Sequence, residues 1–100
     1  MVKHIVLWKL KEEAGGKGKK ENGAALKSRL EALKSLIPQI QELEVGLQME
    51  PNEAAFDVAL YSAFAGRGEL EAYQKNPEHQ KVVEFVRGVT ADRKVVDYEI

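Results

Sequence analysis

The spacing of hydrophobic and polar residues changes along the chain, and these changes divide it into elements. Residues 2–10 are rich in β-branched and aromatic side chains and predict a strand. One face of this strand carries Val2, His4, Val6 and Trp8, and the other carries Lys3, Ile5, Leu7 and Lys9. Since both faces hold apolar residues, we expect both to be covered. Residues 11–23 predict a polar, glycine-rich loop.

A helical period follows. Apolar side chains recur at three- and four-residue spacing over residues 24–37, at Leu26, Leu30, Leu33 and Ile37. This stripe predicts an amphipathic helix, which Pro38 ends because it disfavours helical backbone in the residue before it. Residues 40–49 alternate and predict a second strand with one wetter face, and residues 51–53 predict a turn.

The second half of the chain predicts two further strands and a short helix. The strand 56–64 has one side with large apolar residues, namely Phe56, Val58, Leu60 and Phe64. The other side is smaller, with Ala59 and Ala63, and we expect a helix to lie close against it. Residues 69–74 predict the short helix, and residues 93–100 predict the last strand.

A longer helix is predicted to begin at Asn76 and Pro77. Asparagine is a good N-cap, and proline is tolerated at the first helical position because its missing N–H would have no partner there. His79 then falls in line with three valines at i, i+3, i+4 and i+7 spacing, Val82, Val83 and Val86. A titratable group therefore lies on the face expected to be buried.

The element order β, α, β, β, α, β predicts an α+β fold of the ferredoxin-like type, a four-stranded antiparallel sheet with helices on one face. The face away from the helices is expected to be apolar, with Ile5 and Leu7 from the first strand and Val58, Leu60 and Phe64 from the third. A monomer rarely exposes so large an apolar surface. We therefore expect a homodimer with the two sheets packed face to face.

Composition narrows the class of protein. The chain has 100 residues, of which 44% are hydrophobic and 31% charged, which fits a single globular domain over residues 1–100. A net charge of -1 argues against a nucleic-acid partner, and the lysines of residues 17–20 are expected to be solvated. There is no cysteine and no apolar run long enough for a membrane span. The first strand begins at once, so no signal peptide is expected, and the expected location is cytoplasmic.

Two histidines are the candidate chemical groups. His4 and His79 share faces with apolar residues, so both imidazoles are expected to point into the space between sheet and helices. Burial there favours the neutral ring, which donates from one nitrogen and accepts at the other. Each histidine has two interpretations. His79 is a buried ring satisfied by Asp97, Tyr73 or backbone, or it is a general base or ligand contact, and His4 likewise has a structural or a functional role.

Four more residues have a structural and a functional interpretation. Trp8 and Tyr73 are core aromatics or line a pocket, and Asp57 and Asp97 form salt bridges or take part in the chemistry. Two histidines with a carboxylate have the composition of a metal site, but no tight ligand spacing supports one. We expect no metal and no cofactor.

Several segments carry a family resemblance over nearly the whole chain. They are residues 2–10 (VKHIVLWKL), 43–46 (LEVG), 72–74 (AYQ), 76–80 (NPEHQ) and 95–98 (VVDY). In these segments the chain resembles the stress-responsive A/B barrel domain family. The resemblance implies a ferredoxin-like protomer that pairs into a dimeric α+β barrel. It implies little about activity, because such a fold hosts many unrelated functions.

Some relatives suggest a reaction. Polyketide cyclases similar to this family use a tyrosine and a histidine from the helical region as acid and base, beside a histidine on the first strand. The resemblance places these roles on Tyr73, His79 and His4, and Asp97 stands where such enzymes also have aspartate. A second strand histidine of such a cyclase is matched here by Asp57.

Two functions remain open. The first is a small dimeric binding domain whose cleft takes an apolar or aromatic ligand, contacted by residues from the set His4, Trp8, Asp57, Tyr73, His79 and Asp97. The second is a cofactor-free enzyme of the cyclase, lyase or monooxygenase kind, with His79 as base and Tyr73 as acid. A sealed cavity favours the first, and an open cleft of about 300 Å³ or more onto which His79 and Tyr73 converge favours the second. Because Asp57 breaks the catalytic set, the sequence favours the first.

Overall fold

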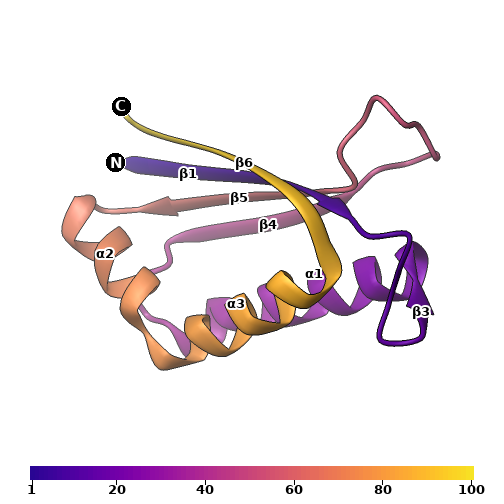
Figure 1. The fold of residues 1–100 in the computed structure, drawn as a ribbon. Helices are drawn as coiled ribbons and strands as arrows, with labels where there is room; N and C mark the ends of the chain where they lie inside the picture. Colours follow the sequence, from indigo (N-terminus) through magenta and orange to yellow (C-terminus); the bar gives the residue numbers. More distant parts are fainter.

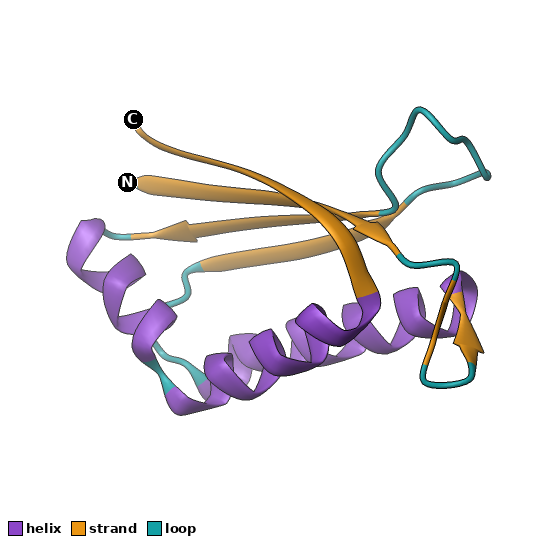
Figure 2. Ribbon diagram, viewed as in Figure 1, coloured by secondary structure: helices purple, strands orange, loops and turns teal.

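The chain forms two layers, a sheet and a set of helices on one of its faces (Figure 1). The structure, a computed structural model, describes residues 1–100. Its elements in chain order are β1 (Val2–Leu10), β2 (Glu13–Ala14), β3 (Lys17–Gly18), α1 (Lys19–Leu36), β4 (Glu42–Leu47), β5 (Val58–Phe64), α2 (Arg67–Lys75), α3 (Pro77–Val89) and β6 (Thr90–Glu99). Four strands form an antiparallel sheet in the order β4-β5-β1-β6. The predicted ferredoxin-like order is confirmed, and Figure 2 shows the helices grouped on one side of the sheet.

The predicted elements differ from the observed ones mainly at their ends. β4 and β5 are shorter than the predicted strands 40–49 and 56–64, whereas α2 and β6 begin before the predicted residues 69 and 93. Such shifts are expected, because propensity fades gradually at an element's end. No helix is long and apolar enough to cross a membrane.

The segment 11–23 was predicted as a loop, and this is wrong. β2 and β3 pair into a small hairpin that turns at Gly15 and Gly16, whose φ angles are 63° and 79°. Two successive residues at positive φ are typical of the tight hairpin turn that matches strand twist, and glycine adopts them without steric cost. The two glycines therefore indicated a turn rather than an unstructured loop.

Helix α1 begins at Lys19, before the predicted start at residue 24. Its first turn is polar, so the leucine stripe could not reveal it. Asn22 is buried in this turn, and its side-chain amide donates to the backbone oxygens of Ala14 and Lys17. These two bonds fix the hairpin onto the start of the helix.

The hydrophobic core lies between the sheet and the helices. The predicted apolar stripe is confirmed, since Leu26, Leu30 and Leu33 of α1 and Ile37, which follows its last residue, are all buried. They pack with the inward side chains of β1, including Val6 and Trp8. Burial of such side chains is worth about 1.5–3 kcal/mol each and is the main stabilising term for a domain of this size.

The predicted orientation of β5 is wrong. Directly opposed residues in an antiparallel pair share a face, and β5 aligns Val58 with Trp8 and Leu60 with Val6. The large apolar residues of β5 therefore face the helices, and Ala59 lies on the outer face. The expected close approach of a helix to the small residues does not occur.

The outer face of the sheet is nevertheless apolar, with a different set of residues. Ile5 of β1 is flanked by Tyr61 on β5 and by Val96 on β6. Leu7, Val96 and Tyr98 are 38%, 53% and 44% exposed. An apolar centre on an otherwise charged surface needs a cover, as expected from the sequence.

The start of α3 is as predicted. Asn76 caps the helix by accepting a hydrogen bond from the backbone N–H of Glu78 at 2.9 Å, and Pro77 is the first helical residue. The valines Val82 and Val86 are buried about two and three turns after the cap. The cap thus fixes where the face carrying His79 points.

We expect Asn76→Ala to lower the free energy of unfolding by about 1 kcal/mol, because it removes the acceptor of the first free N–H of α3. Asn76→Gly should cost only a few tenths of a kcal/mol, since glycine also serves as an N-cap. Urea unfolding followed by circular dichroism measures both. Equal losses in the two variants would contradict the assignment of the cap.

Candidate functional site

A partly open cavity of about 310 Å³ lies between the sheet and α3. Its apolar walls come from both layers and comprise Val6, Leu30, Leu60, Val82, Val83 and Val86. Its polar residues include His4, Trp8, Tyr73 and His79. Most of the predicted site residues are therefore brought together here.

His4 is held by Asp97. The two residues are aligned across β1 and β6, and His4 Nδ1 lies 2.5 Å from Asp97 Oδ1. A carboxylate accepts, so Nδ1 carries the proton and donates. In the neutral ring Nε2 is then an acceptor, and this nitrogen has no hydrogen-bond partner in the protein. The pair resembles a catalytic base, here the imidazole of His4, whose orientation is fixed by a carboxylate, here that of Asp97.

His79 is held in a similar way by backbone. Its Nδ1 donates to the carbonyl oxygen of Gln74 at 3.1 Å, because a carbonyl can only accept. Burial lowers the pKa of His79, the hydrogen bond to Gln74 opposes this shift, and the nearby His4 and Arg93 lower the pKa further. The ring is therefore neutral near pH 7, with an unprotonated Nε2.

Tyr73 completes the group. Its ring centre lies 4.3 Å from that of His79 and 6.3 Å from that of His4. The side chain is fully buried, and its hydroxyl has no hydrogen-bond partner. Burial raises the pKa of Tyr73 to about 12, so the phenol keeps its proton. It is a buried donor without an acceptor.

The indole of Trp8 is a second unpartnered donor. Its Nε1–H is buried and has no acceptor in the protein. Leaving such a group unpaired costs about 1–3 kcal/mol, and unpaired buried donors are rare in native proteins. The only two such side-chain atoms of the chain, on Trp8 and Tyr73, both belong to residues that line this cavity.

Asp57 is not part of this cavity. Its carboxylate accepts from the backbone N–H of Leu10 at 2.8 Å and lies 3.5 Å from Lys19 Nζ. These contacts tie the end of β1 to the start of α1. The resemblance to cyclases matches Asp57 to a second strand histidine of those enzymes, but the residue of β5 that lines the cavity is Leu60.

Sequence reasoning missed two arginines, Arg87 and Arg93, which also line the cavity. A signal for both was present. Arg87 follows Val83 by four residues on a helix, and Arg93 precedes Asp97 by four residues on a strand, so each shares a face with a residue already singled out. The structure brings no three His, Cys, Asp or Glu side chains together as a metal site.

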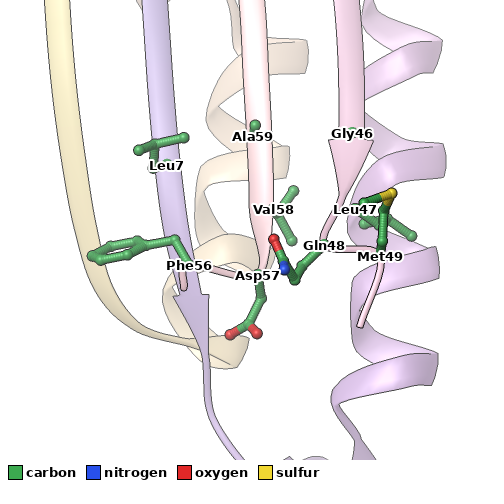
Figure 3. A pocket seen from close by; sticks show the side chains of 9 residues that line it. All are labelled: Leu7, Gly46, Leu47, Gln48, Met49, Phe56, Asp57, Val58 and Ala59. Atoms are coloured by element: carbon green, nitrogen blue, oxygen red, sulfur yellow. The ribbon is translucent and has the colours of Figure 1, made fainter. Parts of the chain in front are cut away.

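Two other hollows carry less chemistry. The largest, of about 630 Å³, lies beside the 48–57 segment, where Lys19 is paired with Glu12 and Asp57 at 3.3 and 3.5 Å. Another, of about 350 Å³, lies on the outer face (Figure 3), where Leu7, Ala59 and Gly46 stand side by side on three strands. Neither is lined by a residue with an unpartnered buried donor, so we place the candidate site in the cavity beneath α3.

Comparison with known proteins agrees with this fold. A family model described as the Stress Responsive A/B Barrel Domain matches residues 2–100. The chain is 36% identical, with a TM-score of 0.86, to a dimeric protein of unknown function and ferredoxin-like fold from Bacteroides fragilis, and the match covers 99% of this chain and 95% of that one.

Two more distant structures share the fold. A dimeric ferredoxin-like protein of unknown function from Thermobifida fusca has 20% identity and a TM-score of 0.84, covering 99% of this chain and 90% of that one. A hydroxynitrile lyase from Passiflora edulis has 18% identity and a TM-score of 0.81, covering 99% and 92%. No curated protein sequence matches the chain.

We expect His79 to titrate below its ordinary pKa of 6.5. In this case the unfolded chain binds the proton at a higher pH than the folded one. The contribution of His79 to stability is therefore present above pH 6.5 and is lost as the pH falls through the lowered folded pKa.

The chain has 2 histidines, so NMR titration of the two ring Cε1–H resonances measures the pKa directly. The variant His79→Gln assigns the signals, and its stability should fall less steeply below pH 6.5 than that of the wild type. A His79 resonance that titrates at or above 6.5 would contradict the burial argument.

Proposed function

We propose that this chain, which belongs to the stress responsive A/B barrel domain family, performs cofactor-free acid–base chemistry on a small carbonyl compound bound beneath α3. One observation carries the proposal. Tyr73, whose buried hydroxyl has no hydrogen-bond partner, packs its ring 4.3 Å from the neutral imidazole of His79, and both residues line a cavity of about 310 Å³. The volume is near the lower end of ligand pockets, about 300–1,000 Å³, so the compound is small.

His79 is the proposed base. Its Nε2 takes a proton from the carbon next to the carbonyl group, since Nδ1 is committed to Gln74 and the ring is neutral near pH 7. Tyr73 donates a hydrogen bond to the carbonyl oxygen, on which negative charge develops as the proton leaves. The resulting enolate either closes a ring on a second carbonyl or expels a leaving group, and the imidazolium of His79 returns the proton.

His4 is proposed to position the compound. Asp97 holds its ring so that Nε2 remains an acceptor, and this nitrogen can take a hydrogen bond from a hydroxyl of the compound. The apolar walls exclude water, which strengthens each of these polar interactions. Neither metal nor organic cofactor has a part in this scheme.

A binding domain without catalysis is the second candidate. It is favoured by one observation: one nitrogen of each imidazole already forms a hydrogen bond with a protein group, as in a structural histidine. The volume and the two unpartnered donors favour catalysis more, because the cavity meets the size expected for an open cleft and Tyr73 and His79 converge on it.

We also propose that two copies pack through the outer faces of their sheets. The row Tyr61, Ile5 and Val96 gives an apolar centre, and the hollow beside Gly46 and Ala59 can receive a side chain of the second copy (Figure 3). The Bacteroides fragilis relative is described as dimeric. A two-fold arrangement places the same patch on both copies.

The enzymatic proposal predicts that the protein accelerates deuterium exchange next to the carbonyl of phenylacetone in D₂O, measured by NMR. Tyr73→Phe should slow this exchange by about 100-fold, the usual cost of one lost donor to a developing oxyanion. Ser35→Ala is the control, because it removes an exposed hydroxyl near the end of α1, outside both the cavity and the outer face of the sheet.

Two results would refute catalysis. Exchange no faster than with the same concentration of free imidazole is one, and an unchanged rate in Tyr73→Phe is the other. Binding of phenylacetone without exchange would favour the binding domain.

The dimer proposal predicts that Val96→Glu weakens self-association at least about tenfold, because a carboxylate would be buried without a partner. Val95→Glu is the control, since this neighbour is similarly exposed, 47% against 53%, but belongs to the opposite face of β6. Sedimentation velocity at several concentrations measures both. A wild-type protein that sediments as a monomer would contradict the proposal.

A further inference from the structure

Two arginines at the cavity have no protein partner. Arg87 of α3 and Arg93 of β6 both line it, and neither guanidinium forms an ion pair or a hydrogen bond with a protein group. The other two arginines are engaged elsewhere. Arg67 binds Glu99 at 2.6 Å, and Arg29 lies over the ring of Phe85 at 4.1 Å.

No carboxylate lines this cavity, although the chain has 16 acidic and 15 basic residues. The carboxylate nearest in register, Asp97, is already bonded to His4. The positive charge of Arg93 reaches His79, whose pKa it helps to lower. The cavity is therefore a local basic site in a chain of net charge -1.

The unpartnered donors point the same way. Arg93 is the cross-strand neighbour of Trp8, so the guanidinium is attached next to the buried indole whose N–H lacks an acceptor. Together with the Tyr73 hydroxyl, the lining of the cavity has two buried neutral donors and two solvent-exposed cations. A ligand that satisfies them is rich in acceptors and carries negative charge.

We infer that the ligand is a compact organic acid with an apolar or aromatic body, whose carboxylate binds Arg87 and Arg93 while its carbonyl or ring oxygen accepts from Tyr73 and Trp8. The inference rests on the proposed function, because it names the class of compound that the same cavity takes. Arginine suits the role, since its planar fork binds both oxygens of a carboxylate at once. The valines and Leu60 then cover the apolar body.

Surface arginines are often simply solvated, so the experiment must separate charge recognition from binding in general. We compare two acids with their neutral amides, benzoylformate with benzoylformamide and cinnamate with cinnamamide. Calorimetry gives the affinities. Trp8 is the only tryptophan, so the single indole N–H resonance reports whether the ligand enters the cavity.

We expect each acid to bind wild-type protein at least tenfold more tightly than its amide and to shift the Trp8 resonance. The double variant Arg87→Gln/Arg93→Gln should bring the ratio of affinities close to one while amide binding is retained. Arg93→Lys, which keeps the charge, should retain part of the preference. The matched control is Arg67→Gln, which removes an arginine outside the cavity and should leave the ratio unchanged.

The outcomes separate this inference from the proposed function. Acid and amide binding equally, with no effect of the double variant, would overturn the inference and leave the proposed chemistry standing. If no probe binds or shifts Trp8, the inference is overturned, and the exchange of phenylacetone alone decides the proposed chemistry. A preference for acids that persists in Tyr73→Phe and disappears in the double variant supports the inference even where deuterium exchange fails.

Discussion

The strand β1 has to be covered on both faces, and the rest of the structure follows from this constraint. Its alternating side chains supply the inward His4, Val6 and Trp8 and the outward Ile5 and Leu7. Because β1 is central in the sheet, its two neighbours are fixed in register against it, and a slip of one residue would exchange the two faces. The same register that buries the core therefore also aligns Asp97 with His4.

The buried polar groups that lack a hydrogen-bond partner are concentrated at the cavity, and their desolvation destabilises the fold there. Most polar groups near the core have partners, such as Ser62, whose hydroxyl donates to the backbone oxygen of His4, and Asn22. Tyr73 and Trp8 do not. Apolar replacements at these positions would avoid the penalty, so stability does not account for the two donors, whereas the proposed bound compound would.

The sequence predicted those features that local chemistry determines. The leucine stripe of α1, the Asn76 cap and the order of elements each follow from spacing and residue type. The orientation of β5 could not be predicted in this way, because both of its faces lack charge and only pairing with β1 decides between them. The position of Asp57 could not be predicted for a similar reason. It lies one residue before β5, and the direction of its side chain is set only when β5 pairs with β1. The polar first turn of α1 leaves no hydrophobic period to detect.

The side chains of strand β6 alternate between the cavity face and the outer face of the sheet, so one strand contributes to both. Arg93 and Asp97 share the inward face with Val95, whereas Val96 and Tyr98 lie on the outward face, and the strand is at the edge of the sheet with a neighbour on one side only. An edge strand held by a single ladder is easily shifted or frayed. A second copy packed against the outward face of β6 would therefore stabilise the position of Asp97, the carboxylate that orients the imidazole of His4. If the chain pairs and catalyses as proposed, dilution would then lower specific activity before the fold is lost.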